Sequence, residues 1–490
     1  MTRLSIFLAI CLCLSLLAGC GSGNQANPAN NALASNPGTT SNGTSSGGAN
    51  NRGTGQGNTV IVSGNKLRVL LGDTYQFTSS YSDATWEVNR VPGGNDLFGT
   101  ISSTGLYTAP AVVPLGGVVI IARSKASNSA TFWSADVGAL TGARFAYASS
   151  ASDNSIQIFT TDEKTGNLQT KSIFSVGPGK APAALALSAN AKFLYSLNRG
   201  TNDISILAIN PATGDLTNAG TVAVPTGPYA MVFSVRGDYA YVSCDGASTI
   251  AAYSVDLSTG ALTPLSAGSY VAGGGRVQSL TISFDGDFLY AANPDANQII
   301  ALAILSDGSL SPIPGSPFTA QPGLSSIVSS KGDYAHDSQQ LFAGGANGIE
   351  VYNRTPSSGA LTYLLALGLT SPGKSPLLFG NTSDGLLIGV NPQSGGGFSY
   401  AFDYLAPVYY PAYLSPGGSP VSTGTSPVVG GWLWNTSGTN WIYVLNGQAD
   451  ASSTTGSIGV YSVDYSNGMV GPTRVIPTSL HNPTGFLVTP

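Results

Sequence analysis

The stretch Phe193–Leu216, FLYSLNRGTNDISILAINPATGDL, contains the pattern on which most of the chain is built. It predicts a short strand, a tight loop, a second strand rich in isoleucine, and a turn centred on Thr213-Gly214. The glycine supplies the positive φ that a tight hairpin turn needs. Variants of this stretch recur from about residue 145 to the C-terminus, so the sequence predicts a repeat protein.

Seven copies of the first strand of this pattern can be recognised, and they start 46 to 55 residues apart. A period of this length with several strands in each repeat predicts an all-β fold, a seven-bladed β-propeller. The seven copies are Phe145–Ser149, Phe193–Asn198, Tyr239–Cys244, Phe288–Asn293, Gln340–Gly344, Leu386–Asn391 and Trp441–Asn446.

The two ends of the repeat region predict how the ring closes. The first copy begins directly at Phe145, without the apolar strand that precedes the others, and the chain finishes with one surplus strand, Pro483–Val488. Placing that strand innermost in the first blade gives three strands from one end and one from the other. Such closure removes an exposed sheet edge. The sixth copy is irregular, and we expect an insertion around Tyr409 to Gly431.

The N-terminus carries an export signal. Arg3 precedes the apolar run Leu4–Leu17, which is too short to span a bilayer. The run ends in Leu17-Ala18-Gly19-Cys20, which resembles the lipobox of bacterial lipoproteins. The resemblance implies cleavage after residue 19 and a lipid on Cys20, and Gly21 favours the outer membrane. The alternative is an ordinary secretory signal with a chance cysteine.

Two segments separate the signal from the repeats. Residues 20–58 are rich in Gly, Ser, Asn and Thr, and we expect a disordered tether. Residues 59–138 alternate short apolar runs with turn residues, which predicts a β-sandwich with Trp86 in its core. Within it, Gly99–Pro110 (GTISSTGLYTAP) resembles bacterial immunoglobulin-like domains, which implies a spacer without an active site. The predicted domains are therefore 1–19, 20–58, 59–138 and 144–490.

The repeats resemble the lactonase-like family of seven-bladed propellers, which includes 6-phosphogluconolactonases and YVTN-repeat proteins. The resemblance rests on the aromatic-Leu/Ala-Tyr strand, the Asn that ends it, the Ile-rich strand and the Thr-Gly-x-Leu turn. It implies lactone hydrolysis by His, Arg and Glu at one mouth of the central channel. The matching positions here carry no His or Arg: they are 182–184, 228–230, 277–279 and 324–326.

Charged and titratable residues near the predicted mouth are the remaining candidates. His481 precedes the closing strand and is a candidate general base, with Arg199 and Arg276 as the other residues of a rearranged catalytic site. A sugar or a small anion would be bound by Arg199, Arg276, Lys374, Asp245 and His481. The alternative is that these are solvated loop charges, as Lys180, Asp203 and Asp295 would also be.

Composition excludes several classes of partner. Charged residues make up 9% of the chain and the net charge is −5, so a nucleic-acid partner is not expected. Residues 368–375 match a P-loop formally, but Pro376 follows where a helix is needed, so no nucleotide site is predicted. No metal or cofactor is predicted. Cys244, the one cysteine of the folded part, is expected to be a buried apolar residue.

Two hypotheses of function stay open. The first is a non-catalytic binding or scaffold lipoprotein of the cell envelope, facing the periplasm or the cell surface, with a glycan, a small anion or an envelope protein as partner. The second is a lactone hydrolase with a rearranged site. A His or a carboxylate beside an arginine at the channel mouth would favour the enzyme.

Overall fold

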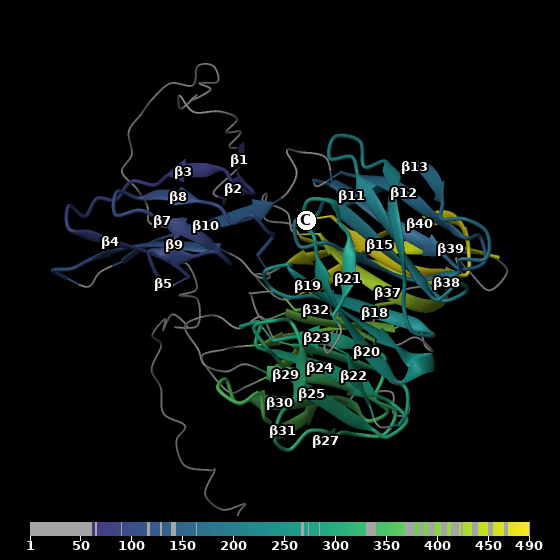
Figure 1. Cartoon of the computed structure of the whole chain (residues 1–490). Helices are drawn as coiled ribbons and strands as arrows, with labels where there is room; N and C mark the ends of the chain where they lie inside the picture. The colour runs from purple at the N-terminus through teal and green to yellow at the C-terminus, as the bar shows by residue number, and fades with distance from the viewer. Residues whose placement is uncertain are drawn as a thin grey trace, which may run out of the picture. The chain divides into compact units, whose positions relative to one another are not determined.

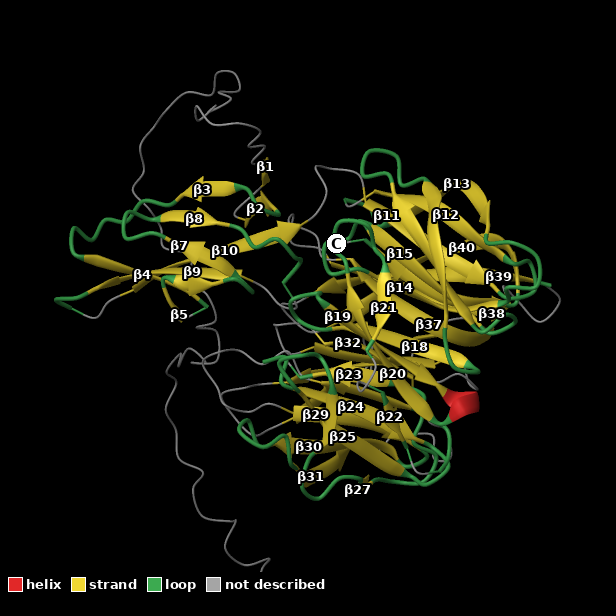
Figure 2. Cartoon of the chain, in the orientation of Figure 1, coloured by secondary structure: helices red, strands yellow, loops and turns green. Residues whose placement is uncertain are grey.

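The computed structural model describes residues 61–489 except 64–65, 90, 115–117, 128–129, 139–143, 163, 266–268, 273, 284, 330–339, 368–376, 382–385, 391–395, 403–408, 413–420, 423–424, 434–439, 449–453 and 465–468. This part consists of β-strands and connecting loops, with one short 3-10 helix, η1 (Asp245–Ala247) (Figure 2). Within it, no helix is long and apolar enough to cross a membrane. The predicted signal, Cys20 and the tether lie outside the described residues.

Strands β1 to β10 form two sheets around one apolar core. One sheet has the order β1-β2-β10-β9-β4-β5, and the other has the order β3-β8-β7-β6. Trp86 is buried in the core as predicted, and its ring stacks on that of Trp133 with 5.7 Å between centroids. The immunoglobulin-like assignment stays a prediction. The strands are β1 (Ile61–Ser63), β2 (Lys66–Leu70), β3 (Thr74–Gln76), β4 (Ala84–Val88), β5 (Val91–Pro92), β6 (Gly94–Asn95), β7 (Gly99–Ile101), β8 (Leu106–Thr108), β9 (Val118–Ser124) and β10 (Ala130–Gly138).

Strands β11 to β41 form seven antiparallel sheets within the described residues, which are the blades of the predicted propeller. From the innermost strand outward, the first three blades are β41 (Pro483–Val488), β11 (Arg144–Ser150), β12 (Ser155–Asp162) and β13 (Asn167–Ser175); β14 (Pro182–Leu187), β15 (Phe193–Asn198), β16 (Asp203–Ile209) and β17 (Leu216–Ala223); and β18 (Pro228–Phe233), β19 (Tyr239–Cys244) and β20 (Thr249–Val255) with the short outer strands β21 (Leu262–Pro264) and β22 (Tyr270–Val271).

The remaining four blades repeat this order. They are β23 (Leu280–Ile282), β24 (Phe288–Asn293), β25 (Gln298–Ile304), β26 (Leu310–Pro312) and β27 (Phe318–Thr319); β28 (Ser326–Ser329), β29 (Gln340–Gly345), β30 (Gly348–Arg354) and β31 (Leu361–Leu367); β32 (Leu377–Asn381), β33 (Leu386–Val390), β34 (Gly396–Phe402), β35 (Tyr409–Ala412) and β36 (Val421–Ser422); and β37 (Thr425–Leu433), β38 (Asn440–Gln448), β39 (Thr455–Asp464) and β40 (Met469–His481).

The inner strands contact one another in a closed ring, in the order β41, β14, β18, β23, β28, β32, β37 and back to β41. The last strand of the chain, β41, pairs antiparallel with β11, so that Val488 lies opposite Ala146. Figure 1 shows the yellow C-terminal strand β40 beside the blue strands β11 and β12. The first blade therefore takes three strands from one end of the repeat region and one from the other.

A tyrosine of the repeated strand fastens each of five blades to the next one. Each tyrosine lies on the second strand of one blade, and its hydroxyl donates a hydrogen bond to a glycine carbonyl in the turn between the third and fourth strands of the following blade. The tyrosine side chains are buried, so each bond satisfies a polar group that water cannot reach. The pairs are Tyr147 with Gly214 (2.8 Å), Tyr195 with Gly260 (2.8 Å), Tyr241 with Gly308 (3.0 Å), Tyr290 with Gly359 (2.7 Å) and Tyr443 with Gly166 (3.0 Å).

The expected insertion in the sixth repeat is wrong. Tyr409–Ala412 forms β35, which pairs with β34 as the fourth strand of that blade. Thr425–Leu433 forms β37, the inner strand of the seventh blade. The described residues of the segment therefore belong to ordinary strands of two blades. Sequence reasoning missed them because it lacks the Thr-Gly turn that marks the fourth strand elsewhere.

Candidate functional site

The candidate residues gather at one end of the propeller because strand direction alternates within each blade. In the second blade, Pro182 at the start of the inner strand lies opposite Asn198 at the end of β15, which lies opposite Asp203 at the start of β16. We call the end at which the inner strands begin the entry face. Loops that follow a second strand and loops that precede an inner strand both lie there.

Arg199 and Asp245 form the centre of the candidate site. Nη2 of Arg199 donates to Oδ1 of Asp245 at 2.7 Å, and the guanidinium lies over the ring of Tyr229, 5.8 Å from its centroid. The Asp245 side chain is 6% exposed and that of Arg199 is 41% exposed, so the pair is anchored at the carboxylate and open at the guanidinium. Arg199 begins the loop of the second blade and Asp245 that of the third, so the pair joins two blades.

Tyr229 is a site residue that the sequence analysis did not select. It is the second residue of the inner strand β18 and is half-buried. Burial and the Asp245 carboxylate raise the pKa of its phenol, while Arg199 and Arg276 oppose that change. The phenol therefore stays protonated at neutral pH, as a hydrogen-bond donor. Its signal in the sequence is an aromatic residue where the second blade has Ala183.

Arg276 extends the cluster toward the fourth blade. Its Nε and Nη2 donate to Oδ1 of Asp295 at 3.0 and 2.8 Å, and its backbone N–H donates to Oδ2 at 2.8 Å. These bonds raise the pKa of Arg276 and lower that of Asp295, and Asp245 and Tyr229 add smaller electrostatic effects on the arginine. Arg276 and Asp295 are both exposed. We call Arg199, Tyr229, Asp245, Arg276 and Asp295 the Tyr229 cluster.

A third ion pair lies in the second blade. Nζ of Lys180 donates to Oδ2 of Asp203 at 2.6 Å, and Nδ2 of Asn198 donates to Oδ1 at 2.6 Å. The Asp203 side chain is only 14% exposed. Burial acts to raise the pKa of Asp203, but the bonds from Lys180 and Asn198 outweigh burial and lower it. The repeat asparagine thus orders the loop that carries Arg199.

We expect Asp203→Asn to lower the free energy of unfolding by about 1–2 kcal/mol at pH 7, because the variant loses a charged acceptor of two hydrogen bonds. The lowered pKa means that this contribution is complete above the ordinary Asp value of 3.8 and disappears as the pH falls through the folded-state value. Denaturant titrations of both proteins between about pH 7 and pH 2 would check this. A gap that stays constant over this range would contradict the prediction.

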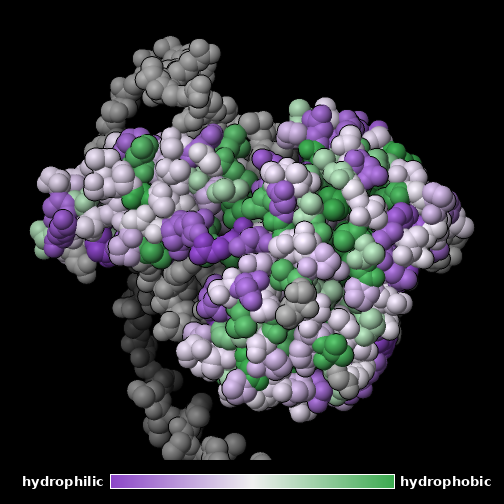
Figure 3. Space-filling model, in the orientation of Figure 1, coloured by the Kyte–Doolittle hydropathy of each residue, from purple (hydrophilic) through white to green (hydrophobic). Residues whose placement is uncertain are grey.

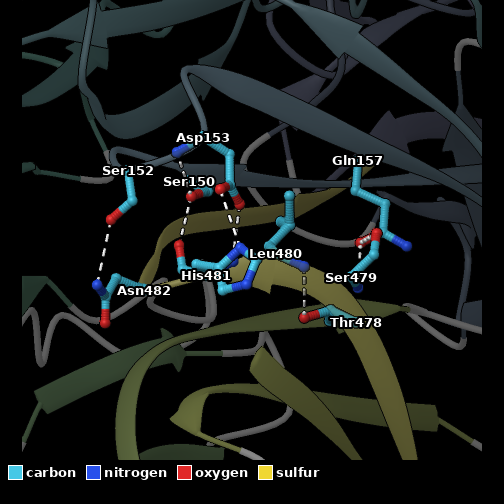
Figure 4. Close-up of polar contacts among 9 residues, drawn as sticks. All are labelled: Ser150, Ser152, Asp153, Gln157, Thr478, Ser479, Leu480, His481 and Asn482. Carbon is cyan, nitrogen blue, oxygen red and sulfur yellow. Dashed lines mark hydrogen bonds and ion pairs between the residues drawn. The ribbon is translucent and has the colours of Figure 1, made fainter. Parts of the chain in front are cut away.

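His481 lies where the ring closes (Figure 4). Its backbone N–H donates to Oδ2 of Asp153 at 2.7 Å, and its Nδ1 lies 3.0 Å from Oδ1 of the same carboxylate. Burial acts to raise the pKa of Asp153, and the two contacts with His481 lower it. Ser150 donates to the carbonyl of His481. The imidazole is half exposed, and no contact in the described part of the chain joins it to Arg199 or Arg276.

The remaining predictions from the sequence concern Lys374, Cys244 and metal binding. Lys374 lies outside the described residues, so it stays a prediction. Cys244 is buried as expected, and burial with the nearby Asp245 charge raises the pKa of its thiol to about 12, which excludes a thiolate nucleophile at neutral pH. Among the residues that the structure describes, no three His, Cys, Asp or Glu side chains are grouped to hold a metal.

Comparison with known proteins identifies the architecture. The family model described as "Lactonase, 7-bladed beta-propeller" matches residues 117–227 and 221–373. No curated protein matches the chain. Among solved structures, the periplasmic gluconolactonase of Pseudomonas aeruginosa is 16% identical, with a TM-score of 0.58 over 71% of this chain and 99% of that one. A protein from Lactobacillus plantarum is 17% identical, with a TM-score of 0.58 over 71% of this chain and 100% of that one.

Proposed function

Since the chain belongs to the lactonase family of seven-bladed β-propellers, we propose that it is an exported envelope lipoprotein whose propeller binds an uncharged, polyhydroxylated ligand at the Tyr229 cluster without hydrolysing it. The lipid on Cys20 would hold it at the outer membrane, facing the periplasm or the cell surface. The lipobox-like sequence before Cys20 supports export and anchoring. A neutral sugar is a ligand of this class.

The observation that carries this proposal is the pairing of the cations on the entry face. Arg199, Arg276 and Lys180 each bind an aspartate within 2.6 to 2.8 Å. Nδ1 of His481 lies 3.0 Å from the carboxylate of Asp153. Hydrolysis of a lactone needs a base beside groups that stabilise the oxyanion as it forms. The described contacts use the arginines and the histidine to fasten loops, and none of them joins the histidine to either arginine.

Charge balance in the Tyr229 cluster supports an uncharged ligand. The two guanidinium groups and the two carboxylates have opposite formal charges that cancel. A phosphate would meet two carboxylates in addition to the arginines, so like-charge repulsion offsets the attraction. Sugar hydroxyls both donate and accept hydrogen bonds, and they fit the free donors of Arg199 and Arg276 together with the carboxylate oxygens. The half-buried Tyr229 ring adds an apolar face.

A second candidate function, lactone hydrolysis, is favoured by the carboxylates beside arginines on the entry face, Asp245 with Arg199 and Asp295 with Arg276, which were expected of an enzyme. The His481–Asp153 pair also favours it. Asp153 holds Nδ1 of the imidazole, which leaves Nε2 as the nitrogen that could accept a proton from water. This arrangement of a carboxylate, an imidazole and a water is a chemically sound general base. The membership of the lactonase family also supports this candidate.

Two measurements distinguish the candidate functions: ligand binding and lactone turnover. Both are made on the wild type and on the variants Arg276→Gln and His481→Ala. Calorimetric titration with neutral sugars, aldonolactones and sugar phosphates is expected to show binding of the uncharged ligands, weakened at least about tenfold by Arg276→Gln. Lys171→Gln, which removes the cation of an outer-strand pair with Asp215, is the matched control. Assays with the same lactones are expected to show no turnover. Lactone turnover that His481→Ala abolishes would establish the hydrolase instead.

A further inference from the structure

Four inner strands share an irregularity near the entry face. In each of them the residue that follows a proline is skipped in the pairing with the second strand, while the residues on either side of it are paired. Such a bulge takes the skipped residue out of the regular alternation of the sheet. Because the inner strands form a closed ring, the skipped positions form a ring of residues at the entry face. They are Ala183, Tyr229, Val428 and Thr484.

Gln278 occupies the same position in the fourth blade. Met231 in β18 lies opposite the residue that follows the repeat tyrosine of its blade, and Leu280 in β23 does so in the next blade. Tyr229 precedes Met231 by two residues, as Gln278 precedes Leu280. Two neighbouring inner strands thus carry large polar residues at equivalent positions.

Backbone contacts hold these two positions beside each other. Oγ of Ser243 accepts a hydrogen bond from the backbone N–H of Ala230, the residue after Tyr229, at 3.1 Å. The same hydroxyl donates to the carbonyl of Gln278 at 2.7 Å. Arg276, two residues before Gln278, lies close enough to Tyr229 to act on the pKa of its phenol. Gln278 therefore borders the Tyr229 cluster.

Tyr229 and Gln278 differ from other polar residues of this ring because the fold does not use their polar groups. The hydroxyl of Thr484 donates to a backbone carbonyl of the next blade, and that of Ser325, the matching residue of the fifth blade, donates to a carbonyl of its own blade. Within the described residues, the Tyr229 hydroxyl and the Gln278 amide have no hydrogen-bond partner. Both residues are half-buried, and neither polar group is sealed from solvent. Both groups are therefore free to bind a ligand.

We propose, resting on the proposed function, that Gln278 is a specificity-determining residue whose side-chain amide selects a ligand with two adjacent hydroxyl groups. A primary amide presents an acceptor oxygen and a donor nitrogen side by side. One hydroxyl of such a pair can donate to the oxygen while its neighbour accepts from the nitrogen. The protonated phenol of Tyr229 would donate to a further ligand oxygen.

A neutral, hydroxyl-rich ligand suits these two groups better than a charged or an apolar one. Neither group carries a charge at neutral pH, so neither can balance the charge of a phosphate. A ligand that covers the amide without bonding to it leaves a desolvated polar group unpaired, which weakens binding. An apolar ligand would also find little to cover on the face drawn in Figure 3, where apolar side chains are scattered among hydrophilic ones.

Calorimetric titration of the full chain with deoxy sugars tests this assignment. The probes are glucose and galactose, each with its 2-deoxy and 3-deoxy forms, because every pair of adjacent hydroxyls on carbons 1 to 4 includes one of these two positions. In the wild type, loss of a hydroxyl of the selected pair is expected to weaken binding at least about fivefold. In Gln278→Met, which removes the amide from a side chain of similar size, the parent and deoxy sugars are expected to bind equally weakly.

Two further variants complete the test. Gln169→Met, on the exposed face of the outer strand β13, is the matched control and is expected to bind as the wild type does. Gln278→Glu keeps an acceptor, removes the donor and is expected to bind the parent sugar more weakly. If Arg276→Gln weakens sugar binding but Gln278→Met leaves affinity and discrimination unchanged, the inference is overturned and the proposed function stands. A wild type that binds neither parent sugar would overturn the inference and the proposed function together.

Discussion

A chain that stops after Asn482 is expected to lose the folded propeller. The truncation removes β41, which pairs with β11 and contacts the inner strands β14 and β37 on both sides. It also removes Phe486, which is 5% exposed and packs against Tyr443 at the junction of the first and seventh blades. Loss of one such buried aromatic side chain costs about 3–5 kcal/mol.

The cost of the truncation is larger than that of one side chain. Thr489, also removed, is fully buried; its backbone N–H donates to the carbonyl of Phe145, and its side-chain hydroxyl accepts from the backbone N–H of Phe145. Without β41 the second strand β11 becomes an exposed edge, and the ring has a gap that no other strand can fill. Because a domain is stable by about 5–15 kcal/mol in total, we expect the cooperative unfolding transition of the propeller to disappear. Scanning calorimetry and near-UV circular dichroism would check this.

A variant with β41 moved to another place in the chain tests whether the propeller needs the strand itself or needs it at the C-terminal end. Residues 483–490 are moved directly before Arg144 and joined to it by a turn of about five residues, the length of the connection between β14 and β15. β41 would then enter the first blade as β14 enters the second, and the transition is expected to return. A truncated chain that melts like the wild type would show that β41 is dispensable and would contradict this account of closure.

The repeat allowed most of the propeller to be predicted, because blade geometry is imposed by local residues. β15 has the bounds predicted for the second copy of the first strand, Phe193–Asn198. The closing strand was predicted because the C-terminal end of the repeat region has one surplus strand and the first repeat lacks its inner strand. The fourth strand of the sixth blade was not predicted, since its position depends on pairing with β34 and no turn residue marks it.

The site was predicted less completely because contacts between blades are long-range. Arg199 and Asp245 were selected separately, but their pairing across two blades depends on how neighbouring sheets pack. Tyr229 was not predicted because a tyrosine in a β-strand usually belongs to the core, and the residues expected at inner-strand positions of a catalytic site were His and Arg. His481 was predicted to reach the entry face, and Asp153, its partner, lies more than 300 residues earlier in the chain.

Replacing Gly260 by alanine is expected to destabilise the propeller much more than the same change at Gly179. Both glycines have a positive φ, of 76° and 71°, so each alanine would cost about 1–2 kcal/mol of backbone strain. At Gly179 a new Cβ would meet nothing within 4 Å. At Gly260 it would lie 2.6 Å from the ring of Phe193 in the neighbouring blade. The difference between the variants therefore isolates the contact between blades.

The expected total at Gly260 is about 2–5 kcal/mol, because overpacking adds about 1–3 kcal/mol to the strain. The carbonyl of Gly260 accepts the hydrogen bond of the buried Tyr195, so a shift of the turn to relieve the clash would stretch that bond as well. The same contact recurs at four other turns, where a Cβ would lie 2.2 to 2.4 Å from an aromatic ring. Denaturant unfolding of the two variants would measure the difference. Equal destabilisation would mean that these turn glycines are needed for backbone conformation alone. A larger loss at Gly260 would explain the pairing that recurs in the repeat. In it, an aromatic residue at the start of the second strand of one blade packs on a glycine in the turn before the fourth strand of the next blade.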